Sequence, residues 1–191
     1  SPVVRNYSVA SWPDGTNKFE LIVTYLEGGK MSEYLFNYIQ VGDEILYKGP
    51  MGIFTLPKDI TDRDIYFVST GSGVSPFRSM INYIYENKVP FKNIKLFFGT
   101  RRTEDIVYKE EFEYLEKELK NFEYIPVLSR EKDTGFKEGH VHEHYLKLID
   151  ESPNKPLVYF CGWNIMIDQG RQELKKRDFQ MMKDIRVEIF G

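Results

Sequence analysis

Cysteine is almost absent from this sequence, and long apolar runs are missing altogether. The single cysteine, Cys161, excludes a disulfide framework, a four-cysteine zinc site and an iron–sulfur cluster held within the chain. It also makes a reducing, cytoplasmic setting the default expectation. The apolar runs fall far short of the roughly 18 residues that a membrane-spanning helix needs, and the first residues carry no signal-peptide pattern. We therefore expect no membrane span.

Neither sign of charge dominates the sequence. Lys and Arg number 26 against 29 Asp and Glu, and the formal net charge of −3 excludes a globally basic nucleic-acid-binding protein. The 191 residues are 41% hydrophobic and 15% aromatic, which is enough for one or two compact domains with cores of their own. The sequence has no internal repeat, so its organisation has to be inferred from the spacing of apolar residues.

Residues 1–60 are typical of antiparallel β-structure. β-branched and aromatic residues gather in short runs, and turn residues such as Asp14 and Gly15 separate them. We expect strands over residues 3–11, 18–26, 44–48 and 53–56. Ser32 is expected to be the N-cap of one short helix. These strands are too few to close a barrel.

Residues 61–191 alternate between strand and helix patterns. Short apolar runs predict strands over residues 64–69, 94–99, 122–128, 157–161 and 185–189. Amphipathic spacing predicts helices over residues 76–86, 109–119, 141–148 and 165–176. Five strands with interleaved helices indicate a doubly wound α/β domain with a parallel sheet covered on both faces. Such sheets bind ligands at the carboxyl ends of their strands.

The sharpest local signal lies between the first strand and the first helix of this second part. Residues 70–73 (T-G-S-G) lead into a helix with Pro76 in its first turn. Glycines let the backbone approach a pyrophosphate closely, and the helix N-terminus supplies free N–H groups. Pro76 stands where the standard dinucleotide fingerprint has its third glycine. A phosphate site and a plain strand–helix turn therefore fit these residues equally well.

Three weaker signals accompany this loop. Residues 29–32 (G-K-M-S) precede the short helix, where an ordinary turn or a second phosphate site is possible. Arg5 and Tyr7 share one face of a predicted strand, so a group that pairs with phosphate lies beside a ring that can stack. Cys161 and Gly162 end the fourth strand of the second part. Cys161 either contacts a ligand at this edge of the sheet or is simply a small buried apolar residue, which is the commoner role of a free Cys.

The histidines and the basic runs are open to more than one interpretation. His140 and His144 share a helix face, but a metal site needs further ligands and only Glu143 stands nearby, so we expect a solvated helix start and no metal site. The basic runs at residues 101–102 and 175–177 fit either solvated faces or docking of an acidic partner.

Taken together, these segments resemble the ferredoxin–NADP reductase family, its plant-type branch in particular, over essentially the whole chain. Residues 5–11 (R-N-Y-S-V-A-S) resemble the family's flavin motif R-x-Y-S-x-x-S. Residues 29–32 resemble its G-x-x-S, and residues 49–52 (G-P-M-G) its G-P-x-G.

The nucleotide motifs follow in the family's order. Residues 70–79 (T-G-S-G-V-S-P-F-R-S) are similar to T-G-T-G-I-A-P-F-R-S, and residues 129–131 resemble its S-R-E. Residues 161–166 match C-G-x-x-x-M, and residues 188–190 (E-I-F) resemble the terminal E-x-Y. Each motif is weak alone, whereas their order and spacing together are specific.

The resemblance implies FAD and NADP as cofactors, with NAD as the alternative coenzyme. In the family, the Arg of the flavin motif holds the FAD pyrophosphate, the Tyr packs on the isoalloxazine, and the terminal aromatic covers the flavin where nicotinamide enters. The implied catalytic residues are Ser8, Cys161, Glu188 and Phe190. The implied cofactor-binding residues are Arg5, Tyr7, Ser8, Gly29, Lys30, Met31, Ser32, Thr70, Gly71, Ser72, Gly73, Ser129, Arg130, Cys161, Gly162 and Met166; Phe136 is a candidate to stack on adenine.

The resemblance also implies the domains and the activity. Residues 1–60 would be the C-terminal part of an antiparallel β-barrel FAD-binding domain whose first strands this chain lacks, and residues 61–191 an NAD(P)-binding α/β domain. The implied enzyme is a flavin-dependent oxidoreductase that passes electrons between NADPH and a small acidic one-electron carrier such as ferredoxin or flavodoxin. The alternatives are an oxygenase reductase component, an NAD(P)H–flavin reductase and a non-catalytic nucleotide-binding module.

Overall fold

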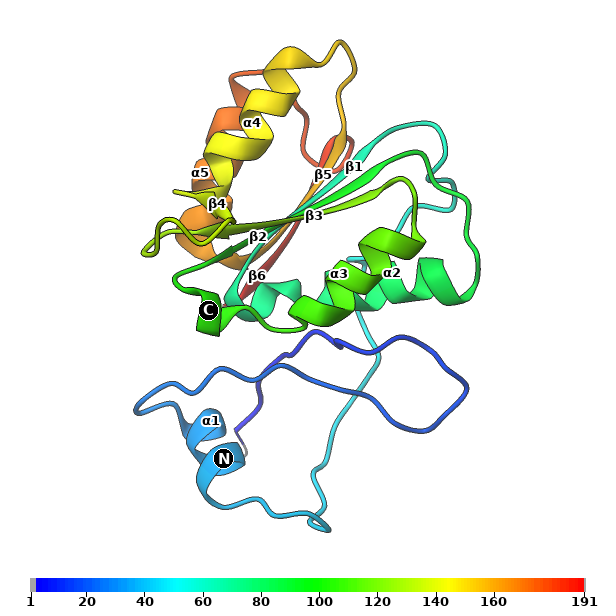
Figure 1. The fold of residues 1–191 in the computed structure, drawn as a ribbon. Coiled ribbons are helices and arrows are strands. Elements are labelled where there is room, and N and C mark those ends of the chain that lie inside the picture. The colour runs from blue at the N-terminus through cyan, green and yellow to red at the C-terminus, as the bar shows by residue number, and fades with distance from the viewer. Residues whose placement is uncertain (1–2, 191) are drawn as a thin grey trace.

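A six-stranded parallel sheet forms the centre of the molecule (Figure 1). The computed structural model describes residues 3–190, apart from the side chain of Phe190. The strands are β1 Ile65–Thr70, β2 Ile94–Thr100, β3 Phe122–Leu128, β4 Lys137–Glu138, β5 Leu157–Trp163 and β6 Ile185–Phe190. Their order, β4-β3-β2-β1-β5-β6, confirms the doubly wound fold. The sixth strand corrects the predicted five: β4 has only two residues, too few to show a periodic pattern.

Helices cover both faces of this sheet (Figure 1). α2 Ser75–Glu86 and α3 Lys109–Glu118 lie on one face, and α4 Val141–Glu151 and α5 Asn164–Lys175 on the other. These bounds confirm the four predicted helices to within three residues at each end. The remaining elements are α1 Lys30–Asn37 and two short 3₁₀ turns, η1 Gly71–Val74 and η2 Thr103–Asp105. Among residues 3–190, no helix is both long and apolar enough to cross a bilayer.

The strands are apolar on both faces because each face has its own core. On the α2–α3 side, the rings of Phe67 and Phe77 stack with centroids 4.5 Å apart. On the α4–α5 side, Tyr145 and Phe160 meet edge to face at 5.8 Å. Gly170 lets α5 approach this pair, because a Cβ there would lie 2.6 Å from the ring of Phe160. Aromatic packing therefore fixes the helices to both faces of the sheet.

Residues 3–60 lie on the α2–α3 side of the sheet and form no regular strand (Figure 1). The predicted antiparallel pairing survives only as an isolated bridge between Val9 and Leu21, next to a hydrogen bond from Ala10 N–H to the Glu20 carbonyl. Two strands without further neighbours are marginal in water. The prediction of Ser32 as the helix cap is also wrong. α1 begins at Lys30 after Gly29, and the Ser32 hydroxyl lies within the helix.

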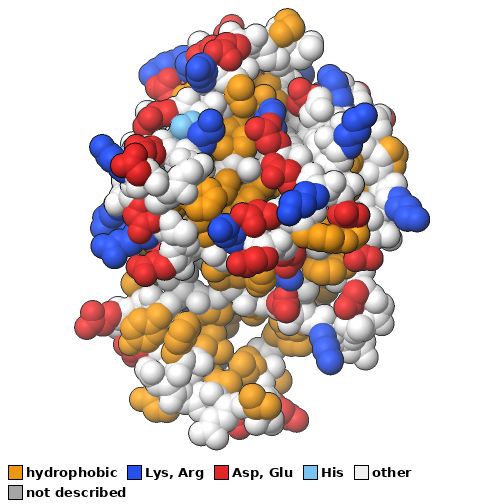
Figure 2. All heavy atoms as spheres, viewed as in Figure 1, with side chains coloured by type: hydrophobic (Ala, Val, Ile, Leu, Met, Phe, Trp, Pro, Cys, Tyr) orange, Lys and Arg blue, Asp and Glu red, His pale blue; other side chains and the backbone are white. Residues whose placement is uncertain are grey.

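Most large apolar side chains of this segment are exposed. Figure 2 shows hydrophobic side chains gathered on the lower part of the molecule, whereas charged side chains are spread over the α/β part. The large exposed apolar side chains of the segment include Phe19, Tyr25, Leu26, Tyr34, Phe36, Tyr38, Leu46, Tyr47, Met51 and Ile53. An apolar surface of this extent is typical of a ligand-binding or interaction site rather than of a free surface.

The end of this segment packs against the α2–α3 core. The ring of Phe54 lies 5.3 Å from that of Tyr159 in β5 and 5.9 Å from that of Phe77 in α2. The Tyr159 hydroxyl donates a hydrogen bond to the Thr55 carbonyl at 2.9 Å. Residues 3–60 are therefore joined to the α/β part by both apolar and polar contacts.

A buried guanidinium links α2 to α3. The side chain of Arg78 is only 8% exposed, and its Nε and Nη2 donate to the two carboxylate oxygens of Glu111 at 2.8 and 2.9 Å. The ring centroid of Tyr108 lies 4.0 Å from the guanidinium carbon, within cation–π range. Asn82 donates to the same carboxylate. A planar donor group is held here by a bidentate ion pair and an aromatic face.

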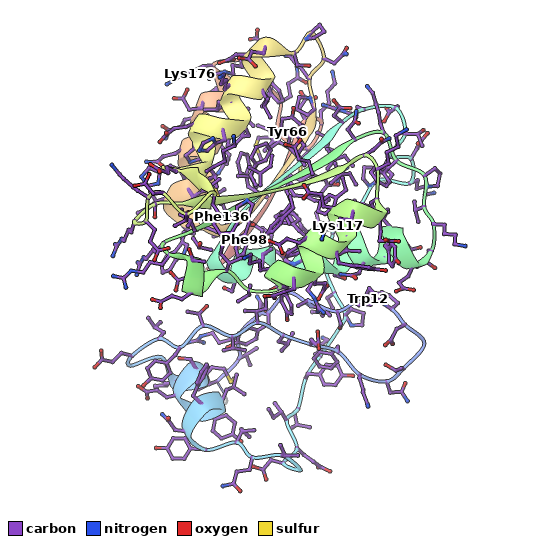
Figure 3. All side chains as sticks on the ribbon, in the orientation of Figure 1. Trp12, Tyr66, Phe98, Lys117, Phe136 and Lys176 are labelled. Carbon is purple, nitrogen blue, oxygen red and sulfur yellow. The ribbon has the colours of Figure 1, made fainter. Side chains whose placement is uncertain are left out.

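The same guanidinium also contacts residues 3–60. Its Nη1 donates to the Ala10 carbonyl at 3.2 Å and forms an ion pair with Glu20. Trp12, labelled in Figure 3 below α2, has its ring centroid 5.4 Å from the guanidinium carbon. Arg78 therefore holds the N-terminal segment against α2 and α3.

Replacing Arg78 tests this junction. We expect Arg78→Met to lower the free energy of unfolding by about 3 kcal/mol, because it leaves the Glu111 carboxylate partly buried without its partner. Lys95→Met is the control, because Lys95 pairs with the half-exposed Glu123 and should cost about 1 kcal/mol or less. Urea denaturation measures both. Equal losses for the two variants would contradict the assigned role of Arg78.

Candidate functional site

A turn without large side chains leads from β1 into α2. Gly71 has a positive φ of 54°, and nothing from the backbone lies near the position of its missing Cβ. A Cβ on Gly73, in contrast, would overlap the carbonyl oxygen of Cys161. The Ser75 hydroxyl donates to the Ser72 carbonyl at 2.7 Å and fixes the entry into α2. Open glycine backbone ahead of a helix N-terminus is suited to bind a phosphate group.

The end of β5 lies directly against this turn. Gly162 has a φ of 136°, and a Cβ there would lie 2.7 Å from the Thr70 carbonyl oxygen. The Trp163 N–H donates to the Thr70 hydroxyl at 3.2 Å. β1 and β5 are the neighbouring strands at which the order of the sheet reverses. In doubly wound sheets, ligands bind in the crevice at this point.

Three of the predicted catalytic residues meet beside these strand ends. The Ser8 hydroxyl donates to a carboxylate oxygen of Glu188 at 2.7 Å, and Glu188 in β6 is the register partner of Cys161 in β5. Ser8 belongs to the N-terminal segment, so residues 180 positions apart converge. Phe190 follows two residues after Glu188 in β6, and its side chain lies outside the described part of the chain.

The Cys161 thiol is fully buried and neutral. Burial raises its pKa well above the ordinary value, and the nearby Glu188 carboxylate raises it further. A thiolate nucleophile or metal ligand is therefore not available at neutral pH. A small, neutral, polarizable side chain remains in the core directly beneath the end of β5.

The predicted flavin residues are spread over the N-terminal segment. Arg5 is exposed, and its guanidinium donates only to the neighbouring Val4 carbonyl at 2.8 Å among the described residues. Tyr7 is half-buried, which raises the pKa of its phenol while the charge of Arg5 opposes the shift. An available guanidinium beside a half-buried ring fits a phosphate-bearing, flat cofactor.

Residues 29–32 form the start of α1. Gly29 is the N-cap, Lys30 is exposed and Met31 is half-buried. The Ser32 hydroxyl accepts from Leu26 N–H at 3.1 Å and donates to the carbonyls of Leu26 and Gly29, both at 3.0 Å. Ser32 therefore shapes the turn before the helix with its own hydrogen bonds and leaves the N–H groups of the helix start to a ligand.

The ends of β2 and β3 bring two arginines together. Ser129 N–H donates to the Thr100 carbonyl and Arg130 N–H to the Arg101 carbonyl, both at 3.0 Å. The exposed Arg101 and Arg130 are thus backbone neighbours. The sequence alone left Arg101 as part of a charge run, although its place directly after a parallel strand is a signal for a ligand-facing position.

Two predicted neighbours of this basic pair have other partners. Glu131 accepts hydrogen bonds from the Thr103 N–H and hydroxyl at 2.8 and 2.6 Å, which lower the pKa of its carboxyl. Phe136 is half-buried, and the Lys109 ammonium lies 5.2 Å from its ring centroid. Glu131 is therefore engaged in shaping a loop, and the face of Phe136 is shared with a cation.

The side chain of Met166 is buried. It is 7% exposed and belongs to the core between the sheet and the α4–α5 layer. Its place in the first turn of α5 directs it inward, and its contact with a cofactor stays a prediction.

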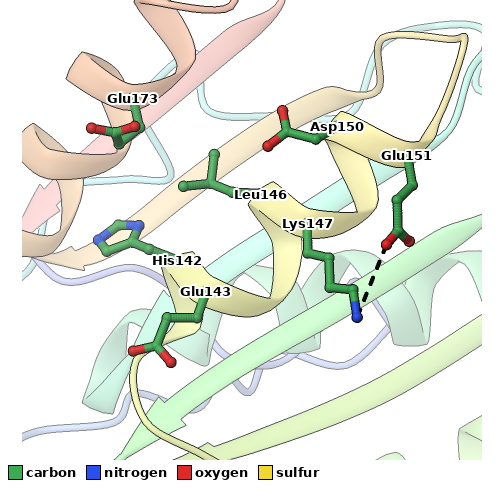
Figure 4. A pocket seen from close by; sticks show the side chains of 7 residues that line it. All are labelled: His142, Glu143, Leu146, Lys147, Asp150, Glu151 and Glu173. Carbon is green, nitrogen blue, oxygen red and sulfur yellow. Dashed lines mark ion pairs between the residues drawn. The ribbon is translucent and has the colours of Figure 1, made fainter.

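The histidines are not gathered around a common point. His142 Nδ1 hydrogen-bonds the Tyr145 hydroxyl at 2.8 Å, and His144 Nε2 contacts the Glu138 carbonyl at 2.8 Å. His142 lines a hollow of about 580 Å³ on the α4–α5 face, and most of the other lining side chains are carboxylates (Figure 4). Within residues 3–190, no group of three or more His, Cys, Asp or Glu side chains is placed to hold a metal ion.

Known proteins share both parts of this arrangement. Residues 1–56 match the family model of the oxidoreductase FAD-binding domain, and residues 67–172 match that of the oxidoreductase NAD-binding domain. "Ferredoxin--NADP reductase B" of Sorangium cellulosum is 36% identical over 176 residues, which cover 89% of this chain and 71% of that protein. "Phenol hydroxylase P5 protein" of Acinetobacter pittii is 34% identical over 97% of this chain and 53% of its own length. The chain spans about half the length of most of the curated relatives it matches.

Solved structures agree on the fold. A cytochrome P450 reductase from Amycolatopsis matches with a TM-score of 0.83 and 26% identity, over 96% of this chain and 55% of that one. A ferredoxin NADP⁺ reductase from Neisseria gonorrhoeae, solved with FAD and NADP, matches with a TM-score of 0.82 and 24% identity, over 97% and 79% of the two chains.

Substitution of Gly73 tests the close approach of the two strand ends. Gly73→Ala should lower the free energy of unfolding by about 1–3 kcal/mol, because its methyl group overlaps the Cys161 carbonyl and the turn has to shift. Ser72→Ala, one residue earlier, adds no atoms and is the control. Chemical denaturation of both variants provides the measurement, and a fully stable Gly73→Ala protein would argue against the tight contact.

The buried thiol predicts a pH dependence of stability. In the unfolded chain the thiol ionises near pH 8.5, whereas in the folded chain its pKa is higher, so the folded state keeps its proton longer. This contribution to stability is present below about pH 8.5 and is lost as the pH rises. Between about pH 8 and 9.5, Cys161 should remove about 1 kcal/mol from the free energy of unfolding. Cys161→Ala should lack this part of the slope; parallel pH profiles of the two proteins would refute the assignment.

Proposed function

The chain belongs to the ferredoxin–NADP reductase-like family of flavoprotein oxidoreductases, and from this premise we propose that it works in an enzyme that passes electrons between NADPH and a one-electron carrier through FAD. One observation carries the proposal: Ser8 from the FAD-binding part contacts Glu188, the strand neighbour of Cys161, beside the glycine turn of the NAD-binding part. The two cofactor-binding parts meet at the place where their ligands have to react.

The N-terminal segment is proposed to bind FAD, which supplies the ability to take two electrons and release them singly. Arg5 pairs with the pyrophosphate, Tyr7 packs against the flavin ring and the start of α1 at residues 29–32 binds a phosphate oxygen. The exposed apolar side chains of this segment leave surface for such a ligand. Ser8 is held in place by the hydrogen bond that it donates to Glu188, and its hydroxyl oxygen is left to accept a hydrogen bond from the reacting edge of the ring.

The α/β part is proposed to bind NADPH across the carboxyl ends of its strands. The turn of Thr70, Gly71, Ser72 and Gly73 holds the pyrophosphate on open backbone and the start of α2. Ser129 and Arg130, with the adjacent Arg101, receive the 2′-phosphate, because two guanidinium groups suit a dianion. Gly162, above the buried Cys161, adds no side chain at the strand end and leaves room for the nicotinamide.

The carrier is proposed to be a small acidic protein such as ferredoxin or flavodoxin, in a cytoplasmic setting that suits a free thiol. The 36% identical relative is named as a ferredoxin–NADP reductase, which supports this acceptor. A second candidate is the reductase component of an oxygenase, because phenol hydroxylase and phenol 2-monooxygenase reductase relatives match at 34% identity.

Activity measurements separate these possibilities. The FAD content of the purified protein is read from its absorbance, and NADPH oxidation is followed with ferredoxin, flavodoxin and free flavin as acceptors. A carrier-dependent rate supports the proposal, and a rate with free flavin alone indicates a flavin reductase. A colourless protein that neither binds nor oxidises NADPH would indicate a non-catalytic module.

The basic pair predicts the choice of coenzyme. Arg130→Ala should weaken NADPH binding about tenfold and NADH binding much less, because only NADPH carries the phosphate that the guanidinium binds. Lys132→Ala, a nearby exposed cation, is the control. Dissociation constants for both coenzymes provide the measurement. Equal losses for NADPH and NADH would exclude Arg130 as the 2′-phosphate ligand.

A further inference from the structure

The largest side chain at the carboxyl end of β5 is left uncovered. Trp163 is the last residue of this strand, and its side chain is 62% exposed although the three residues that precede it are buried. Its backbone is fixed on three sides: the N–H donates to the Thr70 hydroxyl, β6 pairs alongside, and α5 begins at Asn164. The indole is therefore a large, solvent-exposed side chain on a backbone that is fixed by hydrogen bonds.

The indole lies over the glycine turn. Its Nε1 lies 3.7 Å from the position that a Cβ on Gly71 would occupy. Side chains along a strand alternate between faces, so Trp163 shares the face of Cys161, two residues earlier. The ring therefore lies beside the open backbone of the turn, with its N–H donor on the side of Gly71.

Packing within the described chain does not explain this exposure. Tyr159 and Cys161, on the same face of β5, are completely buried in the α2–α3 core, whereas Trp163 lies beyond its end. A rigid aromatic ring with one N–H donor is suited to cover a flat or ring-shaped ligand and to hydrogen-bond an oxygen at its edge. In the sequence alone, Trp163 has the appearance of an ordinary strand end.

We propose that Trp163 positions the nicotinamide half of the coenzyme. The inference rests on the proposed function, because it needs NADPH to lie across the strand ends. The indole packs against the ribose and nicotinamide that extend from the turn along the end of β5, and its Nε1–H donates to an oxygen of the nicotinamide-side phosphate or its ribose. The adenosine half, bound near Arg101 and Arg130 at the ends of β2 and β3, makes no contact with it.

Ligands that contain one or both halves test this role in the full chain. Trp163→Ala should weaken the binding of NADPH roughly three- to tenfold, the range expected for loss of one aromatic contact. The same variant should bind adenosine 2′,5′-bisphosphate, which lacks the nicotinamide half, as tightly as the wild-type protein. Trp163→Phe keeps a ring without the N–H donor, and its NADPH affinity should fall between those of the wild-type protein and Trp163→Ala. Calorimetry gives the dissociation constants.

Fluorescence gives a second and independent readout, since the chain has only two tryptophans. In Trp12→Phe, Trp163 is the remaining donor, and NADPH should quench its emission and produce tryptophan-excited emission from the dihydronicotinamide. In Trp163→Phe, the remaining Trp12 lies at the Arg78 junction and should give a much weaker transfer signal.

The outcomes separate the two proposals. A wild-type protein that binds neither ligand would refute the proposed function itself. If both ligands bind and Trp163→Ala keeps full NADPH affinity, the coenzyme role of Trp163 is overturned while the proposed function stands. Equal loss of both ligands would also overturn it, because it would show a general disturbance of the strand ends. An effect on the Michaelis constant for a protein carrier alone would instead place Trp163 in a docking surface.

Discussion

The geometry of the proposed site depends on one close contact between backbone segments. The glycine turn after β1 packs directly against the end of β5. Gly73 lies against the Cys161 carbonyl, and Gly162 lies against Thr70, at distances that exclude any side chain at either position. This contact places the phosphate-binding turn at the end of β5, directly above the buried, neutral thiol of Cys161. It also places the Trp163 ring, which follows Gly162 directly, over the turn.

A second constraint joins the parts that bind the two cofactors. Arg78 lies in the first turn of α2, the helix that follows the phosphate-binding turn. Its guanidinium binds Glu111 of α3 and, in the N-terminal segment, Ala10 and Glu20. The same helix, α2, therefore starts at the proposed phosphate-binding turn and holds the N-terminal segment, so it sets the position of the flavin-binding residues relative to the coenzyme site. Ser8 and Glu188 then complete the junction by a single hydrogen bond of 2.7 Å.

Local patterns predicted the α/β part well and the N-terminal segment poorly. Strands covered on both faces are continuous apolar runs, and helices have a 3.6-residue period, so both are visible in a short window. Residues 3–60 carry strand-like runs, but a strand also needs at least one hydrogen-bonded neighbour along its length, and in this segment only Val9 and Leu21 form a bridge. The burial of Met166 was not visible either, because its spacing in a motif does not reveal that it points into the core between the sheet and the α4–α5 layer.

The sequence by itself determined the fold class, the order of the cofactor motifs and the residue types that suit phosphate, because these properties depend on neighbours a few positions apart. The tertiary structure decided which of those residues meet. Ser8 and Glu188 lie 180 positions apart, and Arg101 and Arg130 come together only because β2 and β3 pair in register. The tertiary structure also decided which side chains are buried. Cys161 is completely buried, which raises the pKa of its thiol, whereas Trp163, two residues later, is exposed. No local pattern specifies this difference.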